Sequence, residues 1–265
     1  MTPEEVHNEK AWDALVLERS RFANPVRAED LANPENIINP FDWLTDSLKD
    51  RRVLCLAAGG GRHGPVFAKA GAMVTVVDIS EEMLRLDQGV AQREGITLRT
   101  LKASMMNLGE LGDGVFDIVM QPVSTCYVSD LDAVYREVAR VIVPGGTYIV
   151  QHKQPVSLQA ATSLNPDGQY AVTEQYYREG PLPPVMGSKH REEGTQEFLH
   201  TLESLVGGLC RSGFTIDDLR EPRHGQLDAA PGSFSDRSRF IPPYVAIKAT
   251  RRTGGPEVSR IWLPS

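Results

Sequence analysis

The chain has 265 residues, of which 41% are hydrophobic, and a formal net charge of −7 at pH 7. That is enough apolar sequence for the core of one domain with additions. The acidic balance argues against a protein that binds a nucleic-acid backbone, which usually presents a basic face. The longest apolar runs are far too short for a membrane span, and the acidic start Met1–Glu5 does not resemble a signal peptide.

The cysteines also indicate the redox state of the compartment in which the protein is found. Cys55, Cys126 and Cys210 are scattered, with neither a Cys-x-x-Cys pair nor a zinc spacing. Such thiols are typical of a reducing compartment, so we expect a cytoplasmic protein without a metal site.

The first 50 residues precede the most regular part of the sequence. Pro3 to about Arg21 has the pattern of a moderately amphipathic helix, and residues 22–40 are rich in Pro and Asn and predicted to be irregular. A second short helix is expected from Pro40. Trp43 is expected to pack against the core.

A strand, a glycine turn and a helix follow. Val53 to Ala58 is a short apolar run, three glycines come next at residues 59–61, and Pro65 suits the first turn of a helix. A second apolar strand ends at Asp78, whose carboxylate can accept hydrogen bonds from both hydroxyls of a ribose. This order is the opening of a nucleotide-binding βαβ unit.

The glycine spacing bears on which nucleotide is bound. Gly59-x-Gly61-x-x-Gly64 has the letters of the dinucleotide fingerprint, but Asp78 lies only 14 positions beyond Gly64. In dinucleotide-binding proteins that interval is about 20 residues. If Gly61 is the last glycine of the turn, the interval is 17 positions and leaves room for a full crossover helix.

In that register the stretch resembles motif I of the class I S-adenosylmethionine-dependent methyltransferases. The glycine positions of that motif fall on Ala57, Gly59 and Gly61, and Cys55 stands where the family usually has an acidic residue. Ala57 fits such a turn without strain if its φ is negative. Cys55 supplies no carboxylate, so the corresponding contact must come from elsewhere.

Later segments resemble the same family. Ser80 caps a helix directly after Asp78, and Ser104 stands where family members usually carry the acid that binds the adenine amino group. The segment 121–124, Gln-Pro-Val-Ser, follows the fourth strand at the position of motif IV. It lacks the sequence of enzymes that methylate DNA bases. Residues 135–146 match a methyltransferase helix-to-strand motif that ends in Pro-Gly-Gly.

The resemblance implies one doubly wound, Rossmann-like α/β domain over residues 1–265. We expect a mostly parallel sheet of about seven strands with an antiparallel last strand and helices on both faces. The divisions are an N-terminal helical cap (1–50), a cofactor-binding core (51–152), a substrate-covering insert (153–195), completion of the core (196–250) and a tail (251–265). The insert, with a strand predicted at 170–177, is alternatively an edge strand plus a solvent loop. A helix is predicted from Thr195 to Arg211.

The resemblance also implies the cofactor S-adenosylmethionine, with S-adenosylhomocysteine as product. Ile79 and Met83 are expected to enclose the adenine. Trp12 or Phe22 over the pocket is an alternative to packing against the core. The predicted cofactor-binding residues are Ala57, Ala58, Gly59, Gly61, His63, Asp78, Ile79, Met83, Ser104, Met105, Met106, Gln121 and Pro122.

The most probable reaction on this evidence is methyl transfer to an O or N atom of a small molecule. His152, which follows the fifth strand, is the candidate general base, and Tyr127, Tyr176 and Tyr177 are candidate substrate-orienting hydroxyls. A non-catalytic cofactor-binding or partner-regulating protein is the alternative, and an NAD(P)-dependent oxidoreductase a weaker one. We expect neither a nucleic-acid nor a membrane partner, and a homodimer is left open.

Overall fold

The computed structural model describes residues 1–188 and 190–254, so most of the predicted tail (251–265) lies outside the described residues. Its centre is one seven-stranded sheet with the strand order β3-β2-β1-β4-β5-β7-β6. Only β7 runs antiparallel to its neighbours β5 and β6. The predicted fold class is confirmed. The strands are β1 (Arg52–Leu56), β2 (Met73–Asp78), β3 (Arg99–Lys102), β4 (Phe116–Gln121), β5 (Ile142–Lys153), β6 (Phe214–Arg220) and β7 (Tyr244–Arg251).

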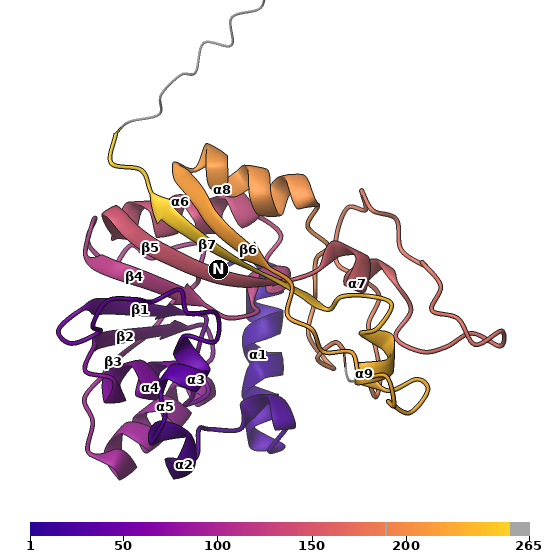
Figure 1. Ribbon diagram of the computed structural model, residues 1–265, viewed down its shortest axis with the longest axis horizontal. Coiled ribbons are helices and arrows are strands. Elements are labelled where there is room, and N and C mark those ends of the chain that lie inside the picture. The colour runs from indigo at the N-terminus through magenta and orange to yellow at the C-terminus, as the bar shows by residue number, and fades with distance from the viewer. Residues whose placement is uncertain (189, 255–265) are drawn as a thin grey trace, which may run out of the picture.

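Helices cover both faces of the sheet (Figure 1). One face carries α4 (His63–Lys69) and α5 (Glu81–Glu94), together with the short α2 (Ala28–Leu31) and α3 (Glu35–Ile38). The other face carries α6 (Leu131–Val141), the π-helical turn η3 (Glu203–Gly207) and α8 (Gly208–Arg211). Because the first five strands are parallel, their carboxyl ends meet at one edge of the sheet, where ligands of such folds bind.

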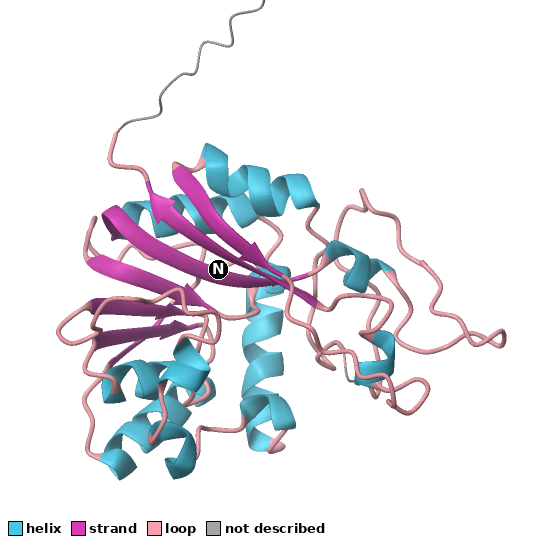
Figure 2. Cartoon of the chain, in the orientation of Figure 1, coloured by secondary structure: helices cyan, strands magenta, loops and turns pink. Residues whose placement is uncertain are grey.

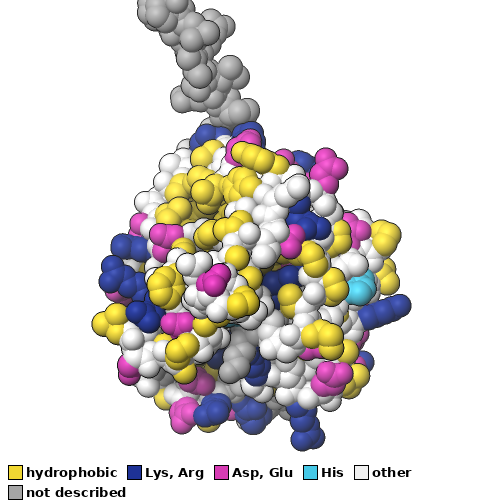
Figure 3. Space-filling model, turned by 90° about the vertical axis from the view of Figure 1, so that its right-hand side faces the viewer, with side chains coloured by type: hydrophobic (Ala, Val, Ile, Leu, Met, Phe, Trp, Pro, Cys, Tyr) yellow, Lys and Arg dark blue, Asp and Glu magenta, His cyan; other side chains and the backbone are white. Residues whose placement is uncertain are grey.

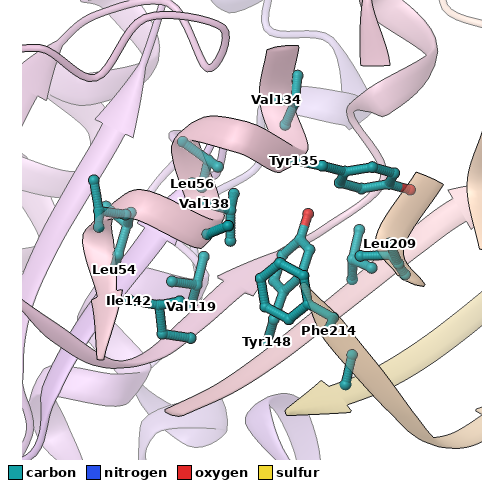
Figure 4. Packing of buried hydrophobic residues seen from close by; sticks show 14 of the residues in the cluster. Leu54, Leu56, Val119, Val134, Tyr135, Val138, Ile142, Tyr148, Leu209 and Phe214 are labelled. Atoms are coloured by element: carbon teal, nitrogen blue, oxygen red, sulfur yellow. The ribbon is translucent and has the colours of Figure 1, made fainter. Parts of the chain in front are cut away.

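The larger part of the core lies between the sheet and α6. Alternate strand residues such as Leu54, Leu56 and Val119 are fully buried there, because successive side chains of a strand point to opposite faces. They meet the apolar side of α6, and Tyr135 of that helix stands edge-on to Tyr148 of β5 (Figure 4). This packing against α6 therefore fixes the position of the sheet.

Helix α1 (Pro3–Leu17) crosses the carboxyl edge of the sheet (Figure 1). Thr2 caps it, and the Glu5 side chain accepts a hydrogen bond from the Thr2 backbone N–H in return. A short 3₁₀ turn, η1 (Arg21–Ala23), follows α1. The predicted helix at Pro40 is wrong, because the Asn39 side chain binds both backbone groups of Leu44 and folds this segment as a turn.

The insert is mostly irregular and forms a lobe beyond the strand ends (Figure 2). Its one helix among the described residues is α7 (Pro155–Gln159). The short α9 (Phe234–Arg237), from the connection between β6 and β7, belongs to the same lobe. Residues 170–177 do not form the predicted strand and make only an isolated bridge between Ala160 and Val172. The predicted helix from Thr195 begins only near Glu203, because residues 195–200 run extended and bond to other segments, as in Phe198 N–H to Cys126 O.

The surface on the insert side has acidic and basic side chains scattered among one another (Figure 3). None of the helices among residues 1–188 and 190–254 is long and apolar enough to cross a membrane.

Candidate active site

The turn between β1 and α4 has an unusual backbone. Ala57 has φ of +47°, and Gly60 and Gly61 have φ of +112° and +71°. The condition for an unstrained Ala57, a negative φ, is therefore not met, and a residue with a Cβ in the left-handed region costs about 1 kcal/mol. Gly59 is needed for a different reason: a Cβ there would lie 2.8 Å from the Cβ of Met83. The turn thus packs directly on the start of α5.

A buried carboxylate from α5 holds this turn. Asp87 Oδ2 accepts hydrogen bonds from the backbone N–H groups of Gly60 (2.9 Å) and Gly61 (3.0 Å). Burial raises the pKa of Asp87 to about 7. Cys55, where an acid was expected, is fully buried in the core. A carboxylate is thus still present at the glycine turn, but it comes from the following helix.

Asp78 at the end of β2 is the second acid beside the turn. Its Oδ2 accepts from Gly59 N–H (2.9 Å) and its Oδ1 from Ser80 N–H (3.0 Å), so its position is fixed by backbone groups. Burial raises the pKa of Asp78 to about 6, and the charge of Asp13 on α1 adds to this effect. Each carboxylate oxygen retains a lone pair, and the side chain lines a cavity.

That cavity has a volume of about 210 Å³ and lies at the carboxyl edge of the sheet. It is lined by the glycine turn, by Asp78, and by residues that follow β3 and β4. Nine of the predicted cofactor-binding residues line it: Ala57, Ala58, Gly59, His63, Asp78, Ile79, Met83, Met105 and Pro122. The structure thus brings together in one place residues that span some 65 positions of the sequence.

Four predicted cofactor-binding residues do not line this cavity: Gly61, Ser104, Met106 and Gln121. Gly61 contributes to the turn behind it. Gln121 is fully buried, with its amide donating to Ser124 Oγ (2.9 Å) and accepting from the Tyr148 hydroxyl. The Gln121 side chain is therefore occupied by the protein itself.

Helix α1 supplies wall residues that sequence reasoning missed. Glu5 and Asn8 line the cavity and are only 3% and 2% exposed. Asn8 donates to Tyr127 O (2.9 Å) and Gln196 O (3.0 Å) and accepts from Gln196 N–H (2.7 Å). Trp12 also lines the cavity and stands edge-on to Tyr127. Nothing local in the sequence marked Glu5 and Asn8 as buried, because polar side chains of a helix are usually exposed.

Glu5 reaches the position where an acid was missing. Its Oε1 accepts a hydrogen bond from Ser104 Oγ, and Ser104 Oγ in turn accepts from Met106 N–H (3.0 Å). Ser104 itself stands behind the cavity wall, while the Glu5 carboxylate is part of that wall. Phe22 from η1 lines the cavity as well, so both aromatic residues of the open alternative, Trp12 and Phe22, lie over it.

The candidate catalytic residues are dispersed. His152 is fully buried between Thr125 Oγ1 (2.7 Å from Nδ1) and the Tyr135 hydroxyl (3.4 Å from Nε2), and burial lowers its pKa to about 3. It does not line the cavity. A general base must reach its proton, so the structure gives no support to that role for His152. The side chain shares a face of β5 with the buried Tyr148, beneath α6.

The three tyrosines also differ from expectation. Tyr127 lines the cavity, but its hydroxyl donates to the buried Glu192 Oε2 at 2.6 Å. The Tyr176 hydroxyl accepts from Leu202 N–H, and Tyr177 is 84% exposed. No described residue of the insert lines the cavity. Residues of the N-terminal segment cover it instead.

A buried ion cluster connects the insert to the site. Lys153 at the end of β5 lies 2.6 Å from Glu192 Oε2 and also pairs with Glu197, which Arg191 contacts from the other side. Two cations and two carboxylates balance, as buried charges require. The cluster fixes Glu192, and Glu192 fixes the ring of Tyr127 in the cavity wall.

The comparisons with known proteins agree with this geometry. A family model described as a methyltransferase domain matches residues 54–150. An uncharacterized methyltransferase of Bacillus subtilis, YbaJ, is 34% identical over 232 residues, which cover 83% of this chain and 91% of that protein. The chain belongs to the S-adenosylmethionine-dependent methyltransferase family.

Solved structures show the same fold. A methyltransferase from Mesorhizobium loti, 22% identical, aligns with a TM-score of 0.63 over 78% of this chain and 93% of its own. Geranyl diphosphate C-methyltransferase from Streptomyces coelicolor, 16% identical, aligns with a TM-score of 0.62 over 94% of this chain and 98% of its own. The cofactor of this methyltransferase is S-adenosylmethionine, which decides between the two interpretations of the glycine spacing.

Proposed function

We propose that this methyltransferase transfers a methyl group to an O or N atom of a small molecule, and that the cavity beneath α1 holds the cofactor. The observation that carries the proposal is the pair of buried carboxylates, Asp78 and Glu5, in the wall of one cavity. Two acids at separate points match a ligand with two separate sets of donors. A ribose diol and an adenine amino group are such donors.

The residues of this chain fit the cofactor part by part. Asp78 presents free lone pairs for the ribose hydroxyls while backbone N–H groups hold it in place. Ile79 and Met83 offer apolar surface for the adenine. Glu5 supplies the carboxylate that Ser104 does not provide. When bound, S-adenosylmethionine supplies an electrophilic methyl group on a positively charged sulfur.

The protein contributes chiefly position. The rigid carboxyl edge of the sheet and α1 exclude water from the cofactor and fix its orientation, which is the main requirement of an in-line displacement. An O–H or N–H acceptor must also lose a proton. His152 is buried away from the cavity, so it is not the group that takes this proton.

Calorimetric titration tests the cofactor assignment. We expect S-adenosylhomocysteine to bind the wild-type protein and NAD not to bind. Asp78→Ala should lower the affinity for S-adenosylhomocysteine about 10- to 100-fold, since the substitution removes charge-assisted hydrogen bonds. Unchanged affinity in the variant would refute the ribose role.

A second experiment separates catalysis from binding alone. Purified protein with S-adenosylmethionine is screened against metabolite pools for production of S-adenosylhomocysteine. Production that depends on an added small molecule supports the transferase proposal. Tight cofactor binding without production across O–H and N–H acceptors would favour the non-catalytic alternative.

A further inference from the structure

A second cavity of about 310 Å³ adjoins the cofactor cavity. Arg62, His63 and Pro122 line both of them, so these residues form the common wall. The second cavity lies between the segment 36–43 and the ends of β4 and β5 on the α3 side of the sheet. Its volume is that of a site for a small organic molecule.

Apolar and aromatic side chains form most of its surface. Ile38, Met120 and Ile149 line it and are almost fully buried. Phe41 and Trp43 also line it, with ring centroids 4.8 Å apart. Such walls suit a flat, largely apolar ligand.

The aromatic wall is held in a fixed shape. The Trp43 indole N–H donates to Asp218 Oδ2 (2.9 Å), and the Trp43 carbonyl accepts from Lys248 Nζ (2.9 Å). The Asn39 side chain closes the loop on Leu44 through two further hydrogen bonds. Because protein groups satisfy these atoms, the cavity is formed before a ligand arrives.

Two basic side chains in the common wall have no hydrogen bond or ion pair with any residue that the structure describes: Arg62 and His63. Burial and the charge of Arg62 lower the pKa of His63 to about 4, so the imidazole is neutral at physiological pH. A neutral imidazole can donate a hydrogen bond from its N–H, but burial and the neighbouring guanidinium both disfavour its protonated form, which makes it a poor base. The guanidinium beside it favours an oxygen that gains negative charge.

We propose that the second cavity binds the methyl acceptor, that this acceptor carries a phenol-type hydroxyl on a flat apolar body, and that it binds beside Arg62 as the ionised phenolate. This inference rests on the proposed function. The acceptor oxygen forms a bond to the methyl carbon while the carbon–sulfur bond breaks and its electron pair returns to sulfur. The O–H proton passes to solvent as the phenol binds, and Arg62 stabilises the charge on the oxygen until the new bond is complete.

The test uses 4-nitrophenol, a flat phenol that quenches tryptophan fluorescence and absorbs differently when ionised. The protein is first saturated with S-adenosylhomocysteine, which fills the cofactor cavity and prevents turnover. We expect 4-nitrophenol to quench the fluorescence of Trp43. Trp43→Phe should remove most of this quench, whereas Trp12→Phe, which changes the cofactor cavity instead, should leave it.

Two variants assign the ligand within the cavity. Ala246 lines the second cavity but not the cofactor cavity, so Ala246→Leu should lower the affinity for 4-nitrophenol at least about 10-fold. Binding of S-adenosylhomocysteine should be retained, which also shows that the variant is folded. Arg62→Gln should raise the apparent pKa of the bound phenol by about one unit, read from its absorption spectrum. A structural role for Arg62 alone would not move that spectrum.

The outcomes are distinct. Quenching that is absent with S-adenosylhomocysteine bound, or that S-adenosylhomocysteine competes away, would overturn the inference, since the phenol then does not occupy the second cavity. Failure of S-adenosylhomocysteine to bind the wild-type protein would refute the cofactor proposal and with it the inference. An unchanged spectrum in Arg62→Gln would overturn the placement of the hydroxyl beside Arg62 and His63.

Discussion

Residues 1–50 and residues 153–195 are both additions to the same sheet, and they meet its carboxyl edge in different ways. The N-terminal segment places Glu5 and Asn8 in the cofactor cavity, where both are almost fully buried. The insert has three tyrosines, at residues 170, 176 and 177, yet none of them lines the cofactor cavity and Tyr177 is 84% exposed. Aromatic content alone therefore does not identify the segment that covers a site. Buried polar side chains with backbone partners on distant segments do identify it.

The largest expected effect comes from detaching the N-terminal segment. Asn8→Ala removes three buried hydrogen bonds that join α1 to residues 127 and 196. We expect the free energy of unfolding to fall by about 2–4 kcal/mol and S-adenosylhomocysteine affinity to fall about 10- to 100-fold. Denaturant titration and calorimetry measure the two quantities.

The matched control lies in the insert. Asn165 also accepts backbone hydrogen bonds, from Asp167 and Gln169, but in an exposed turn. Asn165→Ala should change cofactor affinity less than about 2-fold and stability by under about 1 kcal/mol. Equal losses in both variants would remove the distinction between the two segments.

The next effect concerns ligand selectivity at Glu5. A carboxylate accepts hydrogen bonds from the adenine amino group, whereas the hypoxanthine of S-inosylhomocysteine presents a carbonyl at that position. We expect the wild-type protein to prefer S-adenosylhomocysteine by at least about 10-fold, and Glu5→Gln to reduce that preference about 10-fold, because a glutamine can donate. Calorimetry with both ligands measures this. Glu4→Gln, one residue away and outside the cavity, is the control.

A smaller effect is the pH dependence of cofactor binding. Asp78 has a raised pKa of about 6, so lowering the pH through 6 protonates it. Because the ribose hydroxyls favour the ionised carboxylate, S-adenosylhomocysteine affinity should fall roughly 3- to 10-fold from pH 7 to pH 5 and stay level above pH 7. Asp13→Asn should move the midpoint to lower pH, since the charge of Asp13 contributes to the shift. A flat profile in the wild-type protein would contradict the role of Asp78.

The smallest effect belongs to the insert. Tyr177→Ala should leave both cofactor affinity and the free energy of unfolding unchanged within error, because its side chain is in solvent. Tyr176→Phe loses only the hydrogen bond that the hydroxyl accepts from Leu202 N–H, so the free energy of unfolding should fall by about 0.5–1 kcal/mol. A 10-fold loss of acceptor affinity in either variant would instead support the prediction that the insert covers the substrate.

The sequence allowed the sheet and much of the cofactor cavity to be predicted, because those residues follow strands at short, regular intervals. Asp78, Met83 and Pro122 are of this kind. Glu5 and Asn8 act across more than 90 positions of sequence, and no local pattern reports such a contact. His152 was predictable in principle: it is two residues from Val150 on a strand, so it points into the same core, while Gln151 faces the second cavity.

The hydrogen bonds of Asn8 also have a consequence for turnover. Helix α1 closes the cavity that we propose for the cofactor, and the spent cofactor has to leave after every reaction. Its departure requires the buried contacts of α1 to open, so the same helix that gives affinity sets a limit on the rate of release. Weakening that helix slightly should therefore shorten the residence time of the product and, where release is the slow step, make the enzyme faster.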